Sequence, residues 1–298
     1  MSNEIVKYKN KLNSLNLSDL NSGEFNLFIA IISRLRDKED KKITFTREEL
    51  IRLSGLSVSN KKSKERFNTY MDTTSDKVFD QTLKYISETG SREGIHLFNK
   101  FSRAKDFSTL TIQASNEGLE FFNDLTENFT RFSLQQFTKL RSKYSKTMFM
   151  LLKQYRTTGI KRIKKEDFYT IMGIPPKYKS GNVDQKVINP IKKELAPLFR
   201  NLKFAKVKHH NRVVGYKITF IKEDPNKNDF DYSKSADNEW KYFDTDSDII
   251  THYKEHKEIQ AKQELAKQKA RELKEKVKQV GVIAKESSDW VDLETLNS

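Results

Sequence analysis

The stretch FTREELIRLSGL, residues 45–56, recurs without a gap as IKKEDFYTIMGI, residues 163–174. Each copy begins with an apolar residue typical of a strand, continues with apolar residues at helical spacing, and closes at a glycine, the residue favoured just after a helix. Thr46 and Glu49 of the first copy match a capping box, in which each side chain binds a backbone N–H of the other residue. The repeat therefore predicts a short strand and a helix in each half of the chain.

The similarity between the two halves continues on both sides of the repeat. Before each copy lies an apolar segment that ends in arginine and predicts a buried helix, FIAIISRLR (28–36) and MFMLLKQYR (148–156). A second helix and a two-stranded ribbon are then expected, within 61–87 and 95–114 in the first half and at 178–195 and 203–221 in the second.

The order helix, strand, helix, helix, ribbon is that of a winged helix, which adds a β-hairpin to a helix-turn-helix. We therefore predict an α+β fold of two tandem winged-helix domains with a charged helical C-terminal extension. The alternative is another α+β fold whose halves look alike by chance. The predicted domains are 1–126, 127–222 and, for the extension, 223–298.

The second-half helix, YKSGNVDQKVINPIKKEL (178–195), has an apolar face and a face of amides and lysines. In a helix-turn-helix the second helix enters the major groove, where Asn and Gln pair with adenine and Lys reaches guanine or phosphate. Pro190 lies in the middle and predicts a kink, because proline lacks a backbone donor. The residues predicted to face DNA are Asn182, Gln185, Lys186, Asn189, Lys192 and Lys193.

Other basic residues near this helix are suited to phosphates, which position a protein on DNA without specifying sequence. They are Lys179, Lys206, Lys208 and Arg212, the last at a turn predicted over HHNR (209–212). The alternative is a merely solvated lysine face, but such a face would carry glutamate as well. Only Asp184 and Glu194 are acidic here.

The first half offers a more dilute version of the same surface. A basic run is followed by cations and an amide opposite an apolar helix face, and Asp76 and Asp80 dilute the charge. This half could read DNA or hold a protein partner, and the sequence leaves both open. The candidate contacts are Lys61, Lys62, Lys64, Arg66, Lys77, Gln81 and Lys84.

Composition supports a nucleic-acid partner and excludes several other classes of site. The 298 residues carry a formal net charge of +15, which favours binding to a polyanion, and contain no cysteine, which excludes disulfides and thiolate metal sites. No apolar run is long enough for a membrane span and no signal segment precedes the first domain, so we expect a cytoplasmic protein that does not bind membranes.

Enzymatic motifs are missing or weak. There is no GxxxxGK[ST] nucleotide loop, and HYKEH (252–256) matches an H-x-x-E-H zinc string only within a highly charged helix without a third ligand. We expect no catalytic residue, no metal and no cofactor.

The stretch FTRFSLQQFTKLRSKYSKTMFMLLKQYR (129–156), together with IKKEDFYTIMGIPPKYK and VINPIKKEL, resembles the theta-type plasmid replication initiators, most of all those of Gram-positive plasmids. These are iteron-binding Rep proteins with tandem winged helices. The most specific points are the LRSKYS…LLKQYR run and the proline in Ile188-Asn189-Pro190, and the resemblance covers about residues 5–222.

The resemblance implies binding to direct repeats in double-stranded DNA at a plasmid origin, opening of an adjacent AT-rich segment, and recruitment of the host initiator and helicase. It also implies a dimer, joined through the first module, that represses the protein's own gene. The rivals are a dedicated transcriptional repressor, a DNA nicking enzyme and a protein-interaction scaffold.

After Lys222 the sequence becomes an acidic linker, followed by a charged helix over roughly 250–280 and an acidic tail with Trp290. A thin seam of weak heptads runs along this helix, so it is an isolated solvated helix or a coiled coil. The tail is a frayed end or a peptide that docks on a partner.

Overall fold

The computed structural model describes residues 4–36, 42–79, 82–86, 91–123, 125, 128–223, 262, 265, 268 and 269. The chain divides into two units, Met1–Asp244 and Thr245–Ser298. In the second unit the described residues, Lys262, Leu265, Gln268 and Lys269, are helical and exposed. The rest of the predicted C-terminal helix, its heptad seam, the acidic linker beyond Glu223, HYKEH and the acidic tail lie outside the described residues.

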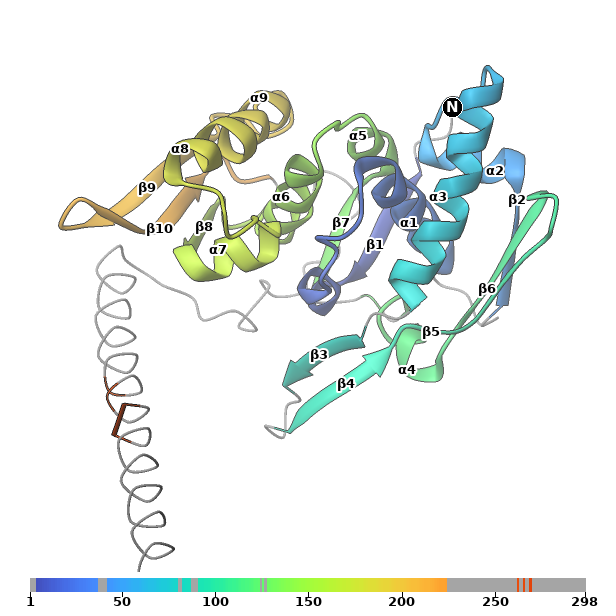
Figure 1. Cartoon of the computed structure of the whole chain (residues 1–298), viewed down its shortest axis with the longest axis horizontal. Helices are drawn as coiled ribbons and strands as arrows, with labels where there is room; N and C mark the ends of the chain where they lie inside the picture. The colour runs from blue at the N-terminus through green and yellow to red at the C-terminus, as the bar shows by residue number, and fades with distance from the viewer. Residues whose placement is uncertain are drawn as a thin grey trace, which may run out of the picture. The chain divides into compact units, whose positions relative to one another are not determined.

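The first half forms a winged helix with an additional hairpin (Figure 1). Strand β2 pairs with β6, and β6 pairs with β5, so the strand before the helix-turn-helix joins the ribbon after it. In chain order the elements are α1 (Ser22–Leu35), β2 (Lys42–Thr46), α2 (Arg47–Ser54), α3 (Lys61–Phe79), β3 (Thr82–Ile86), β4 (Arg92–His96), β5 (Phe98–Arg103), β6 (Thr109–Ala114) and α4 (Asn116–Leu119).

The second half repeats this topology without the additional hairpin. Its three-stranded sheet has the order β8-β10-β9, so β8 again pairs with the last strand of the ribbon. The elements are α6 (Lys143–Gln154), β8 (Ile160–Lys164), α7 (Lys165–Met172), α8 (Ser180–Val183), the π-helical turn η2 (Asp184–Ile188), α9 (Asn189–Leu195), β9 (Lys203–His209) and β10 (Arg212–Thr219).

The internal repeat predicted from the sequence is confirmed in the backbone. Phe45 is paired with Leu110, and its counterpart Ile163 is paired with Tyr216, each on the last strand of its ribbon. Gly55 and Gly173 both end their helix in the left-handed region, at φ 63° and 56°, which favours glycine.

The predicted capping box is half formed. The hydroxyl of Thr46 accepts a hydrogen bond from the backbone N–H of Glu49 at 3.2 Å. The carboxylate of Glu49 instead pairs with Arg34, with 3.2 Å between Nε and Oε1. The acidic side chain therefore ties α2 to α1, while the threonine alone caps the helix.

Two expectations for the first half differ from the structure in detail. The second helix lies within 61–87 as expected but ends at Phe79, and residues 82–86, which include Lys84 expected on its face, form strand β3, which pairs with β4. The ribbon, expected to begin at residue 95, begins at Phe98 because Ile95 belongs to β4. The apolar spacing of Leu83 and Ile86 fits a helix as well as a short strand, and β-sheet pairing with the following strand β4 decides between them.

The N-terminus and the segment between the halves build a junction that joins the two modules. Strand β1 (Ile5–Lys9), followed by the 3₁₀ turn η1 (Asn10–Ser14), pairs with β7 (Phe129–Ser133), which leads into α5 (Leu134–Thr138). A chain of aromatic rings with centroids 5.0–5.8 Å apart crosses the junction: Phe25, Phe137, Phe132, Phe149, Phe199 and Phe220. The modules therefore share one hydrophobic core.

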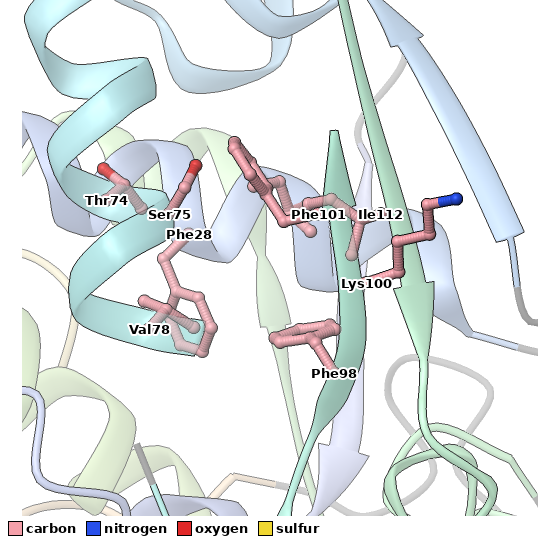
Figure 2. Close-up of a pocket in the computed structure, with 9 residues that line it drawn as sticks. Phe28, Thr74, Ser75, Val78, Phe98, Lys100, Phe101 and Ile112 are labelled. Atoms are coloured by element: carbon pink, nitrogen blue, oxygen red, sulfur yellow. The ribbon is translucent and has the colours of Figure 1, made fainter. Parts of the chain in front are cut away.

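A small apolar cavity lies between α1, α3 and the β5–β6 ribbon (Figure 2). Phe28, Val78, Phe98 and Phe101 line it, and its volume of about 20 Å³ leaves room for about one water molecule. In Figure 2 the amine of Lys100 points away from the cavity. The cavity is a packing gap and is too small to bind a substrate.

No helix within the described residues is long and apolar enough to cross a membrane.

Candidate nucleic-acid interface

The predicted DNA-reading helix runs from Ser180 to Leu195 as α8, η2 and α9 (Figure 1). It stays helical through Pro190 because the turn before the proline is π-helical: the N–H of Asn189 bonds to the carbonyl of Asp184, five residues back. A wider turn relieves the clash of the proline ring with the preceding turn and leaves no donor to satisfy at Pro190. Val183, Val187 and Leu195 are buried, as the periodicity predicts.

The opposite face of this helix is exposed and basic. Five of the residues predicted to face DNA are exposed on this helix: Gln185, Lys186, Asn189, Lys192 and Lys193. The ammonium of Lys186 lies over the ring of Tyr178, 5.1 Å from its centroid, at the edge of this face. These side chains combine bidentate amides with cations, the two groups that read adenine and guanine in the major groove.

Both acidic residues of the helix are engaged away from its exposed face. The carboxylate of Asp184 pairs with Lys206, with 2.6 Å between Oδ2 and Nζ. Glu194 accepts hydrogen bonds from the backbone N–H groups of Arg141, at 2.9 Å, and Ser142, at 3.2 Å, at the start of α6. The face keeps its positive charge because both carboxylates are used for internal contacts.

Three residues predicted to contact DNA differ in whether their side chains already have a partner within the protein. Asn182 is half-buried, and its Oδ1 accepts the backbone N–H of exposed Lys179 at 3.2 Å, a contact that competes with bidentate pairing to adenine. The ammonium of Lys206 pairs with Asp184 in this structure, so its predicted contact with a phosphate would compete with this ion pair.

The wing of the second module presents two further cations at its tip. His210 and Asn211 have φ of 45° and 63°, as in the two-residue turns that close tight hairpins. The predicted turn at 209–212 is thus confirmed, and His209 pairs with Arg212 across it. Lys208 and Arg212 are exposed, so they are placed where a wing can reach a phosphate backbone.

In the first module the basic run lies at the start of α3. Lys61, Lys62, Lys64 and Arg66 are exposed, and Asn60 caps this end by accepting the N–H of Ser63 at 2.9 Å. The N-terminal part of a recognition helix is the part that meets base edges. These four residues therefore form the candidate contact of the first module.

Lys77, predicted to contact DNA, is engaged in contacts within the first module. Its ammonium pairs with Glu24 at 2.7 Å and donates to the carbonyl oxygen of Asp19 at 3.1 Å. Burial alone would raise the pKa of Glu24, but hydrogen bonds from Lys77 and Thr73 lower it below its ordinary value. Lys77 thus ties α3 to α1 while its side chain stays partly exposed.

One further first-half prediction lies apart from α3. Lys84 is exposed on strand β3, so it does not share a helix face with the basic run. Gln81 lies outside the described residues.

Sequence reasoning missed the basic residues of the junction and one buried lysine. Lys139 and Arg141 are exposed between α5 and α6, Arg141 within the LRSKYS motif noted only for family resemblance and Lys139 directly before it. Lys146 is fully buried and donates to Oδ1 of Asn26 at 2.5 Å and to the carbonyl of Phe137 at 3.0 Å. Burial lowers the pKa of Lys146 to about 7, although Glu194 opposes this shift. No local pattern marks a lysine on a helix as buried.

No cluster of three or more His, Asp or Glu side chains that could hold a metal ion occurs in the part of the chain that the structure describes.

Comparison with known families matches residues 5–153 to "Initiator Replication protein, WH1" and residues 164–220 to "Initiator Rep protein, WH2". A "Probable replication protein rep" of Bifidobacterium longum (strain NCC 2705) is 31% identical over 228 residues, which are 76% of this chain and 75% of that protein. The solved Pi initiator protein, in complex with iteron DNA, shares the fold with a TM-score of 0.58 at 12% identity, over 75% of this chain and 99% of that one. The predicted tandem winged helices are confirmed, and the chain belongs to the family of initiator replication proteins.

Proposed function

We propose that this chain starts plasmid replication by binding directly repeated double-stranded DNA sites at the origin, with its two modules in successive major grooves. The observation that carries the proposal is the exposed face of the helix from Ser180 to Leu195, which presents amides and lysines while both carboxylates of the helix are held in internal contacts. The Pi initiator, which has the same fold, was solved with iteron DNA. The family membership supports a role at an origin.

The two modules have different parts in this proposal. The second module reads bases through Gln185, Lys186 and Asn189, while Lys192, Lys193 and the wing cations hold phosphates. The first module adds the basic start of α3, one helical turn of DNA away, since paired reading helices engage half-sites about 34 Å apart.

The later steps follow from binding alone. Several copies on adjacent repeats bend the origin and open an AT-rich segment without chemical catalysis, and the bound copies recruit the host initiator and helicase. A dimer on an inverted repeat represses the protein's own gene. We place these events in the cytoplasm, where plasmid DNA is copied.

The test is DNase footprinting of the DNA upstream of the protein's own gene, at about 150 mM salt to weaken non-specific binding. Wild type is compared with Lys186→Ala/Asn189→Ala. The proposal predicts evenly spaced protection over direct repeats, which the double variant loses.

Two controls separate the rival functions. Protection of a single inverted repeat, with no replication of a plasmid that carries the region, would identify a dedicated repressor. Supercoiled plasmid incubated with the protein and magnesium or manganese stays intact for an initiator that is not an enzyme, whereas nicked product would identify a DNA-cleaving activity.

A further inference from the structure

A polar hollow of about 330 Å³ opens at the junction of the two modules. One side is formed by the first turns of α3, with Arg66 and Tyr70, and the other by the segment between α5 and α6, with Lys139 and Arg141. Asn26 of α1 also lines it, and its Oδ1 accepts a hydrogen bond from the buried Lys146. The hollow therefore lies between α3 of the first module and the segment that leads into α6.

The charged side chains that line this hollow are all cationic. Arg66, Lys139 and Arg141 are exposed, and within the described part of the chain their side chains have no hydrogen-bond or ion-pair partner. Among the described residues, no aspartate or glutamate lines the hollow. Three unpaired cations around a water-filled concavity repel one another, and an anion that enters it relieves this repulsion.

The carboxylate beside the hollow does not cancel this charge. Glu194 points to the backbone N–H groups of Arg141 and Ser142, which start helix α6, and so it serves as a cap. The side chain of Arg141 is left free to face the hollow.

The contacts of Arg66 and Arg141 place the hollow between the two candidate reading helices. On one side Arg66 belongs to α3, four residues from the helix start at Lys61–Lys62. On the other side Glu194 of α9 holds the backbone of Arg141, which lines the hollow. A DNA duplex that receives both helices in successive major grooves must pass a phosphate backbone between them.

We infer that this junction hollow binds phosphates of the DNA strand that crosses from one major groove to the next, through Arg66, Lys139 and Arg141. The inference rests on the proposed function and adds a site to it. Phosphate contacts fix register without reading sequence, so the hollow sets the spacing of the two modules on each repeat. Each neutralised phosphate adds roughly 0.9 to the slope of log affinity against log salt.

The experiment measures that slope for Lys139→Gln/Arg141→Gln. Both residues are exposed, so the substitutions leave the core intact. The matched control is Arg92→Gln/Lys100→Gln, which removes the same charge from exposed positions on β4 and β5 that do not line the hollow. The inference predicts a slope smaller by about 1.8 in the junction variant, and the wild-type slope in the control.

A second arm changes the DNA instead of the protein. Uncharged methylphosphonates replace the phosphates midway between the two major-groove segments of a repeat. They weaken wild-type binding, and they have little further effect on the junction variant, because both changes remove the same contact. Equal weakening of both proteins, or an unchanged slope in the junction variant, would overturn the inference.

Two further outcomes are distinguished by the same measurements. If inorganic phosphate, at constant ionic strength, binds the wild type but methylphosphonates have no effect, the hollow holds a free anion and the assignment to a DNA strand is wrong. If wild type does not bind the repeats at all, the proposed function fails, whereas a failure of the inference alone leaves wild-type binding intact.

Discussion

The two candidate reading helices use the same scaffold for different surfaces. In each module a helix that ends at a left-handed glycine precedes the reading helix, and a three-stranded sheet follows the same pairing order. On α3 the exposed cations are concentrated in the first turns, and farther along Asp72 pairs with Arg103 at 2.5 Å and Lys77 pairs with Glu24. On the helix from Ser180 to Leu195, exposed lysines and amides continue to Lys193.

This difference shows what determines how much of a reading helix is available to DNA. The backbone supplies a helix that can enter a groove, and the placement of acids decides how much of it remains available to DNA. The second module turns its acids toward Lys206 and the start of α6. In the first module, some cations are held in internal ion pairs. We therefore expect the second module to read bases and the first to hold mainly phosphates.

The largest expected effect tests this division directly. Lys186→Ala/Asn189→Ala removes base contacts worth roughly 1–3 kcal/mol each, so affinity for the repeat falls by at least about 30-fold while binding to unrelated DNA changes little. Lys61→Ala/Lys64→Ala weakens both DNAs alike and lowers the salt slope by about 1.8. Competition binding at several salt concentrations measures both quantities. Loss of sequence preference in the first-module variant alone would reverse the comparison.

An intermediate effect concerns the buried lysine that joins the modules. Because the pKa of Lys146 is lowered to about 7, the unfolded chain binds more protons than the folded one between pH 7 and the ordinary lysine pKa of 10.5. The stabilisation that Lys146 gives relative to Lys146→Met should rise with pH above 7, by up to about 1.4 kcal/mol per unit. Below pH 7 this difference is constant.

Urea unfolding at pH 6, 7, 8 and 9 measures this difference between wild type and Lys146→Met. Lys203→Met, at an exposed position, is the control and should follow wild type at every pH. A stability difference between wild type and Lys146→Met that does not vary with pH would show that Lys146 is not held in a desolvated site.

The smallest effect compares one acid from each module. Asp184→Asn frees Lys206 beside the reading helix and removes a negative charge, so DNA affinity rises by roughly 2–5-fold at low salt and returns to the wild-type value at about 0.5 M salt. Asp72→Asn makes the same change behind the basic run of α3 and should alter affinity less. Titration of labelled repeat DNA with each variant measures the change in affinity. An equal gain in affinity from both variants would contradict the proposed difference between the modules.

Much of the fold could be predicted because it depends on local patterns. The gapless repeat with its shared glycines predicted both helix-turn-helix units, and the alternation of Val214, Tyr216 and Ile218 predicted the second ribbon. The hairpin of β3 and β4 could not be predicted in the same way. Its apolar residues continue the helical spacing of α3, and only pairing across the intervening turn makes them strands.

The site was predictable in its charge but not in its pairings. Lys77 meets Glu24 from 53 positions away, and Lys206 meets Asp184 from 22. Such partners are set by tertiary packing, which composition and periodicity do not describe. Pro190 shows the same limit, since its local rule predicts a kink but not the π-helical turn that precedes the proline.

The most direct test of the account uses the absence of cysteine from the chain. Ser59→Cys, one residue before the cap of α3, and Ser180→Cys, at the start of α8, each introduce a single exposed thiol for attachment of an iron chelate that cleaves nearby DNA. The account predicts two cleavage centres within each repeat, about 10–10.5 base pairs apart, one from each variant. Coincident centres, or no cleavage from Ser180→Cys on DNA that it protects, would contradict the claim that both helices enter successive major grooves.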